Sequence, residues 1–282
     1  MKTIGFKKIL SFCVIAIMTT SCVSRGKYVV LTSKANELRK INTELKKSKL
    51  TLTNQKNSMT NEIEAKNKLI KSKAFEINKY ITDLGLESQI EAEDLRVINL
   101  NFEYSKRTEK QKNFKIERNL IDVARKTSWL SKIEKDAYYY LNYARVYPAE
   151  FCDAYIIPMF KEKPNDVYLA TLIVLMKEMA PMDPINPDKT LFDEAKCHAT
   201  TSGKQGIVGH SRISAQCTSS FMGECISYGN GSGLDHVVRL LIDRNVESLG
   251  HRYICLSEGY KICGISKAYH STYNECLVLD FK

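Results

Sequence analysis

The fold is best recognised from one stretch near the C-terminus, Leu240-Leu241-Ile242-Asp243-Arg244-Asn245-Val246-Glu247-Ser248-Leu249-Gly250-His251-Arg252. Two shorter polar stretches precede it, Gly209-His210-Ser211-Arg212 and Gly223-Glu224-Cys225. Imidazole and carboxylate groups bind divalent metals and transfer protons near neutral pH. A glycine directly precedes His210, Glu224 and His251, and glycine lets backbone or ligand approach closely. We therefore expect a functional site in this half of the chain.

The composition, with 44% hydrophobic and 26% charged residues among 282, is typical of a folded globular protein and excludes a disordered one. Its length allows one or two domains. Residues 116–282 hold 19 Lys and Arg and 20 Asp and Glu, whereas residues 1–115 hold 23 basic and 12 acidic residues. The net charge of +10 therefore belongs to the N-terminal part.

Residues 1–22 have the organisation of an export signal. Basic residues come first, Ile9–Met18 is a nearly continuous apolar run, and small residues lead to Cys22. The run is too short to span a bilayer, which takes about 20 apolar residues. The end of the segment resembles the lipobox of bacterial lipoproteins, in which Cys22 would be lipidated and become the first mature residue. A plain signal peptide cut near Ser21 is the alternative.

Such a leader predicts a chain that is exported and lipid-anchored to the bacterial cell envelope, with the membrane as a partner. The stretch Val23-Ser24-Arg25-Gly26-Lys27 is basic, which favours a periplasm-facing location. Export also permits disulfides. Seven cysteines follow residue 150, and an odd number leaves at least one without a partner in the chain. Cys263–Cys276 is the favoured pair because these residues flank a predicted hairpin, and Cys217–Cys225 comes next.

A heptad repeat dominates residues 23–85. One seam position holds Leu31, Leu38, Leu45, Leu52 and Met59, and the other then continues with Ile63, Ile70, Ile77 and Leu84. This pattern predicts a coiled coil and a homo-oligomer, with a length of roughly 80 Å at 1.5 Å per residue. Some core-type positions are polar, and such residues can fix register or partner number: Asn42, Lys49, Lys56, Lys66 and Lys73. A single charged helix is the alternative.

We interpret residues 86–127 as a basic linker or helical region. Residues 95–102 fit a strand or a helix equally well. The charged run from Ser105 to Glu117 fits a solvated helix face or linker, and basic stalks also touch phosphates on lipid surfaces. We expect no nucleic-acid binding, because the chain is predicted to be exported and its globular half is neutral.

Residues 128–282 have the pattern of a globular domain. An expected helix over 119–146 leads into it. Further helices are expected over 167–179, 191–201 and 234–244, and strands over 262–268 and 275–281 around a turn. Helices followed by a terminal hairpin predict an α+β fold with a mainly antiparallel sheet.

The order of several motifs resembles the bacterial branch of the CAP superfamily, also called SCP domains (cysteine-rich secretory, antigen 5 and pathogenesis-related proteins). The resemblance covers roughly residues 128–282. The motifs are Leu141-Asn142-Tyr143-Ala144-Arg145-Val146-Tyr147-Pro148, Ala195-Lys196-Cys197-His198-Ala199, Gly209-His210, Gly223-Glu224, Glu247, Gly250-His251-Arg252 and Cys263-Gly264-Ile265. It implies an α-β-α sandwich with a large cleft lined by two histidines and two acidic residues.

Carried over residue by residue, the resemblance makes His210 and His251 the two histidines, which would hold zinc or another divalent metal. Glu224 and Glu247 would be the acids, binding the metal through water or carrying protons as catalytic groups. Cys225 stands where the family motif Gly-Glu-Asn has asparagine. The tryptophan often found before the second histidine is also absent.

Other polar residues of this half have simpler structural interpretations. His198 lies on an amphipathic helix and is expected to pack or form hydrogen bonds, and His236 is expected to begin a helix. His270 is expected to be exposed in a turn. Arg145 and Arg252 are expected to anchor loops or carboxylates inside the domain.

The sequence contains no Gly-x-Ser-x-Gly, His-Glu-x-x-His or phosphate-loop motif. The first hypothesis is therefore an envelope-anchored binding module for a lipid, glycan, peptide or protein. The alternative is a metal-assisted hydrolase or peptidase in which His210 and His251 hold the ion and Glu224 activates water. A third hypothesis makes the coiled coil an oligomerising spacer of the envelope.

Overall fold

The computed structural model describes residues 25–98, 102–106 and 117–282. The predicted leader, with Cys22, lies outside the described residues. The chain forms two compact units, residues 1–67 and 68–282. Within the described ranges, no helix has the length and apolar character needed to cross a membrane.

Helix α2 (Arg25–Asp83) spans the predicted heptad region, and its seam has two environments. In the first unit the seam is open: Leu38 and Leu45 are 66% and 63% exposed. In the second unit the seam residue Ile77 is buried in the core of the globular domain, as is Ile81, which lies off the seam. The last turns of the predicted coiled coil therefore pack against their own chain.

The segment after α2 is part of this domain. The side-chain amide of Asn78 donates to the carbonyl of Ile90 at 2.8 Å, and its oxygen accepts from the Ile90 amide at 3.0 Å. A short 3-10 helix, η1 (Asp94–Val97), follows, where the sequence fitted a strand or a helix. Ile90 and Leu95 are buried, and the compact unit begins at Lys68.

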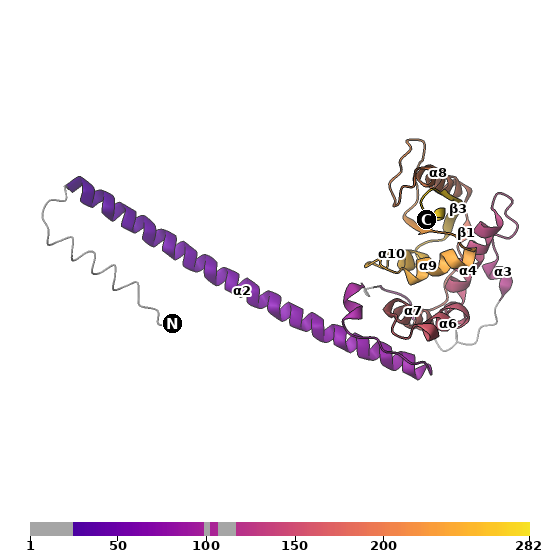
Figure 1. The fold of residues 1–282 in the computed structure, drawn as a ribbon, viewed down its shortest axis with the longest axis horizontal. Helices are drawn as coiled ribbons and strands as arrows, with labels where there is room; N and C mark the ends of the chain where they lie inside the picture. Colours follow the sequence, from indigo (N-terminus) through magenta and orange to yellow (C-terminus); the bar gives the residue numbers. More distant parts are fainter. Residues whose placement is uncertain (1–24, 99–101, 107–116) are drawn as a thin grey trace. The chain divides into compact units, whose positions relative to one another are not determined.

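The globular domain is α+β, as predicted (Figure 1). Its helices are α3 (Arg118–Ile121), α4 (Lys132–Val146), α5 (Pro148–Phe151), the π-helix η3 (Cys152–Ile156), α6 (Ile157–Glu162), α7 (Val167–Glu178), α8 (Lys189–Gln205), α9 (Gly233–Ile242) and α10 (Gly250–Cys255). Its strands are β1 (Asn186–Pro187), β2 (Gly223–Tyr228), β3 (Ile262–His270) and β4 (Asn274–Phe281). The helix expected over 119–146 is divided, because Ser131 and Glu134 form a capping box that begins α4.

The four strands form one mixed sheet in the order β1-β3-β4-β2. β4 is antiparallel to both β2 and β3, and only the two-residue β1 is parallel to its neighbour. The predicted hairpin of β3 and β4 is confirmed, and the sheet is mainly antiparallel.

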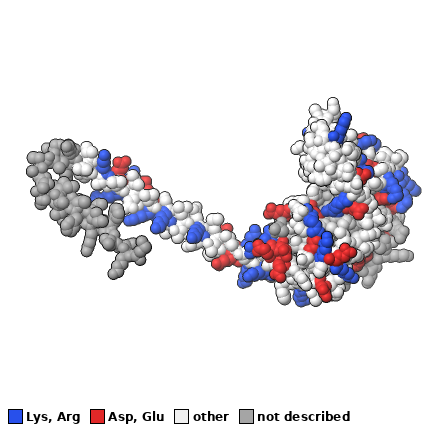
Figure 2. Space-filling view, viewed as in Figure 1, with Lys and Arg blue, Asp and Glu red and all other residues white. Residues whose placement is uncertain are grey.

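Helices cover both faces of this sheet. Helix α8 packs on β3 and β4, whereas α4, α9 and α10 pack on the other face (Figure 1). Alternation along β4 supplies both cores: Cys276 and Val278 face α8, and Leu277, Leu279 and Phe281 face the main core. On the visible face of the domain acidic and basic side chains are interspersed, in line with its neutral count (Figure 2).

Glycine 264 allows the close contact between β3 and α8. A Cβ atom there would lie 2.0 Å from the backbone carbon of Leu191, which no side chain could tolerate. The glycine of the Cys263-Gly264-Ile265 motif is thus explained by packing.

One disulfide is present among the described residues, Cys197–Cys217, and both predicted pairs are wrong. Cys263 pairs across the hairpin with Phe281, and Cys276 pairs with Ala268, so the two cysteines lie far apart along it. They also face opposite cores. Cys217 has its partner on α8, which leaves Cys225 as a buried free thiol.

Candidate functional site

His210 lies on the long loop between α8 and β2, and neighbouring groups fix this loop. His198 on α8 donates from Nε2 to the carbonyl of Gly209 at 3.0 Å. The amide of Gly209 donates to the hydroxyl of Tyr228 at 2.9 Å. Gly209 has φ 107°, a conformation that glycine adopts without strain. The residue before His210 is therefore held on both sides.

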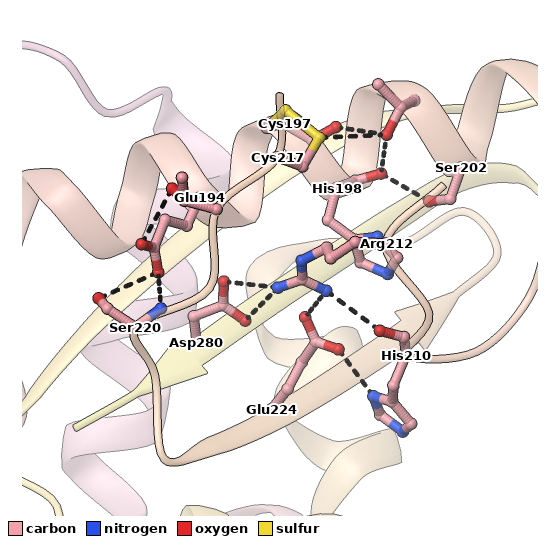
Figure 3. Close-up of polar contacts among 12 residues, drawn as sticks. Glu194, Cys197, His198, Ser202, His210, Arg212, Cys217, Ser220, Glu224 and Asp280 are labelled. Atoms are coloured by element: carbon pink, nitrogen blue, oxygen red, sulfur yellow. Dashed lines mark hydrogen bonds and ion pairs between the residues drawn. A yellow bond between two sulfur atoms is a disulfide. The ribbon is translucent and has the colours of Figure 1, made fainter. Parts of the chain in front are cut away.

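The ring of His210 is bound to a buried carboxylate. Its Nδ1 lies 2.8 Å from Oε1 of Glu224 (Figure 3). Because an ionised carboxylate only accepts hydrogen bonds, Nδ1 carries the proton, and Nε2 holds the lone pair when the ring is neutral. The hydrogen bond to Glu224 raises the pKa of His210, and burial offsets part of this rise. The ring is 57% exposed, so its Nε2 edge is accessible.

Glu224 belongs to a charge network that also contains Arg212 and Asp280. Arg212 Nη1 lies 2.6 Å from Glu224 Oε2, and its Nη2 lies 3.2 Å from Asp280 Oδ2 (Figure 3). The two carboxylates are close because Glu224 on β2 pairs directly with Asp280 on β4. Both side chains are almost completely buried. One guanidinium therefore serves two carboxylates.

The pKa values of these two carboxyl groups move in opposite directions. It raises the pKa of Asp280 to about 9, and the hydrogen bond with Glu224 adds to this rise. Burial also raises the pKa of Glu224, but hydrogen bonds from His210 and Asp280 and the charge of Arg212 bring it below its ordinary value. At neutral pH Asp280 is therefore protonated and Glu224 is ionised.

His251 is held in a similar way by Asp243. Its Nδ1 lies 2.7 Å from Asp243 Oδ1, and its backbone amide donates to Oδ2 at 2.8 Å. Asp243 ends α9 with φ 53°, a left-handed conformation that Asp tolerates better than most residues. This turn directs its carboxylate toward the first turn of α10. His251 is 21% exposed.

The two histidines lie side by side. Their ring centroids are 6.1 Å apart with an interplanar angle of 39°. Each uses Nδ1 for a carboxylate, which leaves each Nε2 for a ligand. The arrangement brings together His210, His251 and Glu224, three of the four site residues that the sequence predicted.

Glu247, the fourth predicted site residue, is exposed on the loop before α10. It lines a hollow with Val167 and Tyr168, and no hydrogen bond or ion pair of its side chain is present in the described part of the chain. The second acid of the site is Asp243, which the sequence interpretation missed. Asp243 belongs to the same polar stretch, but only the left-handed turn after α9 brings it to His251.

Two further contacts anchor the loop that carries His210. The Cys197–Cys217 disulfide ties it to α8. Glu194, also on α8, accepts from the amide of Ser220 at 2.8 Å and from the hydroxyl of Thr218 at 3.2 Å (Figure 3). The loop has no regular secondary structure between residues 207 and 222, so these side-chain contacts determine its position.

The remaining histidines are buried. His198 packs and hydrogen-bonds as expected, and burial lowers its pKa. His236, at the start of α9, bonds to the hydroxyl of Ser227 at 2.9 Å, and burial lowers its pKa to about 4. His270 was expected to be exposed, and this is wrong. Its Nδ1 accepts backbone amides of the β3–β4 turn, which draws the ring inside.

Arg145 and Arg252 are anchors inside the domain, as expected. Arg145 donates to the carbonyls of Cys255 and Ser257, each at 2.8 Å. Arg252 donates to the carbonyl of Ile242 at 2.8 Å. Arg145 thus holds the C-terminal end of α10, and Arg252 holds α10 to the end of α9.

Within the described ranges no cluster of three or more His, Cys, Asp or Glu side chains is arranged to hold a metal ion. The site offers two imidazole nitrogens. Comparison of the sequence with models of protein families and with curated proteins finds no match.

Proposed function

We propose that this chain is an envelope-anchored binding protein of the CAP type, with His210 and His251 as its ligand site. The observation that carries this proposal is the pair of carboxylate-backed imidazoles, 6.1 Å apart. A carboxylate on Nδ1 fixes the ring and makes Nε2 a better electron-pair donor. The order of the family motifs and the helices on both sheet faces support the CAP assignment.

A divalent ion such as zinc fits this donor set as a two-histidine site. With Zn–N bonds of about 2.0–2.1 Å, two imidazoles on one ion have centroids roughly 5–6.5 Å apart. Asp243 and Glu224 are then the outer carboxylates that orient metal-binding histidines. Such an ion would supply an electron-pair acceptor for a carboxylate, phosphate or carbonyl oxygen of the ligand.

Binding is better supported than hydrolysis. The alternative requires Glu224 to activate water, but this carboxylate is 2% exposed and paired with Arg212. Its lowered pKa makes it a weak base. Asp243 is equally buried and is engaged by backbone amides of α10. Neither acid is available to take a proton from water.

We further propose that the leader and Cys22 anchor the chain to the bacterial envelope, facing the periplasm, and that α2 is its spacer. The exposed seam of residues 31–63 would pair with a second copy of the chain. The open Leu38, Leu45 and Leu52 support this, because apolar side chains at heptad spacing gain by burial against a partner helix.

Calorimetric titration of the metal-free full chain with zinc tests the site. We expect one ion per chain, and at least tenfold weaker binding in the double variant His210→Ala/His251→Ala. Glu247→Gln is the matched control and should bind like the wild type. If zinc fails to bind, and neither acetate nor inorganic phosphate shifts the ring resonances of both histidines, the proposed ligand site is wrong.

Sedimentation of the full chain tests the spacer. We expect an oligomer that Leu38→Lys/Leu45→Lys converts to a monomer. Leu50→Lys is the control, because Leu50 is 64% exposed but lies off the seam. A monomeric wild type would contradict the proposed pairing.

A further inference from the structure

Three free thiols lie between the sheet and α10. Cys225 on β2, Cys255 at the end of α10 and Cys263 on β3 are all completely buried. The side chains of Cys225 and Cys255 are neighbours, and the proximity of Cys255 contributes to raising the pKa of Cys225. The Cys225 thiol also lies 3.7 Å from the carbonyl of His251, one helical turn before Cys255.

The strand register explains why these thiols meet. Cys225 pairs with Leu279, and Leu279 faces the main core, which α10 covers. Cys263 faces the same core but pairs with Phe281, and β4 separates β3 from β2. Of these two strand cysteines, Cys225 is therefore the one on β2, the strand that α10 contacts.

We propose that Cys225 and Cys255 form a second disulfide, which fastens α10 to β2. This inference rests on the export that we propose for the chain, because disulfides persist in oxidising compartments. The bond would join the two halves of the site, since Cys225 follows Glu224 and Cys255 lies one turn after His251. The loop that it closes contains α9 and Asp243.

The chemistry is ordinary thiol–disulfide exchange. The two S–H bonds break, one S–S bond forms, and two protons and two electrons leave. A disulfide of low-molecular-weight thiol or of an oxidoreductase accepts the electrons and becomes two thiols. Burial raises the pKa of the Cys225 thiol well above its usual value, so the attacking thiolate forms while α10 is open or before it docks.

Peptide mapping tests the pair. The purified full chain is unfolded, refolded with oxidised and reduced glutathione, and treated with N-ethylmaleimide before proteolysis and mass spectrometry. We expect Cys197–Cys217 and Cys225–Cys255 peptides, with alkylation of Cys152, Cys263 and Cys276. Alkylated Cys225 and Cys255 beside an intact Cys197–Cys217 bond would overturn the proposal, and so would a Cys255–Cys263 peptide.

Hydrogen exchange tests the fastening without a cysteine variant. Amides of residues 250–255 should exchange at least tenfold more slowly in the oxidised chain than in the same chain with the pair reduced. Cys276→Ser is the control for other buried thiols and should keep this difference. Equal exchange in both forms contradicts the fastening.

The same mapping on chain taken from the host envelope separates this inference from the proposed function. An alkylated Cys197–Cys217 pair in that sample would contradict the export. The refolded chain would still decide whether Cys225 and Cys255 pair.

Discussion

His210 and His251 make the same contact with a carboxylate in different surroundings. The charge of Glu224, beside His210, is balanced by Arg212, and Asp280 adds a hydrogen bond. The charge of Asp243, beside His251, is stabilised by hydrogen bonds from backbone amides at the start of α10. One half of the site thus depends on a buried charge network, and the other depends on a helix terminus.

This difference determines what each half tolerates. A buried ion pair is costly to break, because the partner is left as an uncompensated charge. A carboxylate on backbone amides keeps those donors whatever happens to other side chains. We therefore expect the His210 half to be the more sensitive to substitution.

The largest effect is expected for Arg212→Ala. It leaves Glu224 buried without its cation, which should lower the free energy of unfolding by about 3–5 kcal/mol. Denaturant unfolding followed by the single tryptophan, Trp129, which packs on Phe192 of α8, measures this. Lys261→Ala is the control: its ion pair with Asp183 is exposed, so it should cost less than about 1 kcal/mol. Similar losses in both variants would remove the distinction between the halves.

A smaller loss of stability is expected for the double variant Cys197→Ser/Cys217→Ser. The disulfide closes a loop of 20 residues, and its removal should lower the free energy of unfolding by about 3 kcal/mol. The loop with His210 loses an anchor, whereas His251 keeps its contacts. Ring resonances in NMR spectra should therefore broaden or shift for His210 and stay in place for His251. A change confined to His251 would refute this assignment of the anchor.

Much of the site was predictable from local sequence. His210, Glu224 and His251 each follow a glycine in a short polar stretch, so the three residues could be named before the fold was known. The α+β class and the terminal hairpin followed from periodicity. These features depend on neighbours in the chain, which the sequence contains.

The parts that could not be predicted depend on long-range geometry. Asp280 reaches Glu224 only through the register of β2 on β4, and Asp243 reaches His251 only through a left-handed turn. The disulfide could not be predicted because the sequence does not show that the loop with Cys217 folds back onto α8. The heptad repeat of α2 could be recognised in the sequence. The repeat does not show that Ile77 packs against its own chain and not against a second helix.

Asp243→Asn should weaken zinc binding by about 10–100-fold, because outer carboxylates of metal-binding histidines contribute that much affinity. The amide keeps an oxygen for the backbone donors of α10, so the fold should persist, which circular dichroism checks. Glu247→Gln should leave affinity unchanged in the same calorimetric titration. An equal loss for both variants would restore Glu247 as the second acid.

The last prediction concerns how stability depends on pH. The pKa of Asp280 is raised to about 9 in the folded chain, so the folded state binds a proton that the unfolded state releases above its ordinary carboxyl pKa. The stability from this group is complete below about pH 4 and is lost as pH rises toward 9. The raised pKa of His210 acts in the same direction.

The lowered pKa values of His198 and His236 act in the opposite direction below about pH 6.5. Melting temperatures are therefore compared between pH 7 and 9, where they should fall with rising pH. The fall in melting temperature should be shallower in Asp280→Asn, because asparagine has no proton to lose. The part of the fall that is due to His210 should remain in this variant. Asp183→Asn is the matched control at an exposed carboxylate and should preserve the wild-type slope. An unchanged slope in Asp280→Asn would mean that Asp280 is ionised beside Arg212. The His210 half would then hold two charged carboxylates where the His251 half holds one.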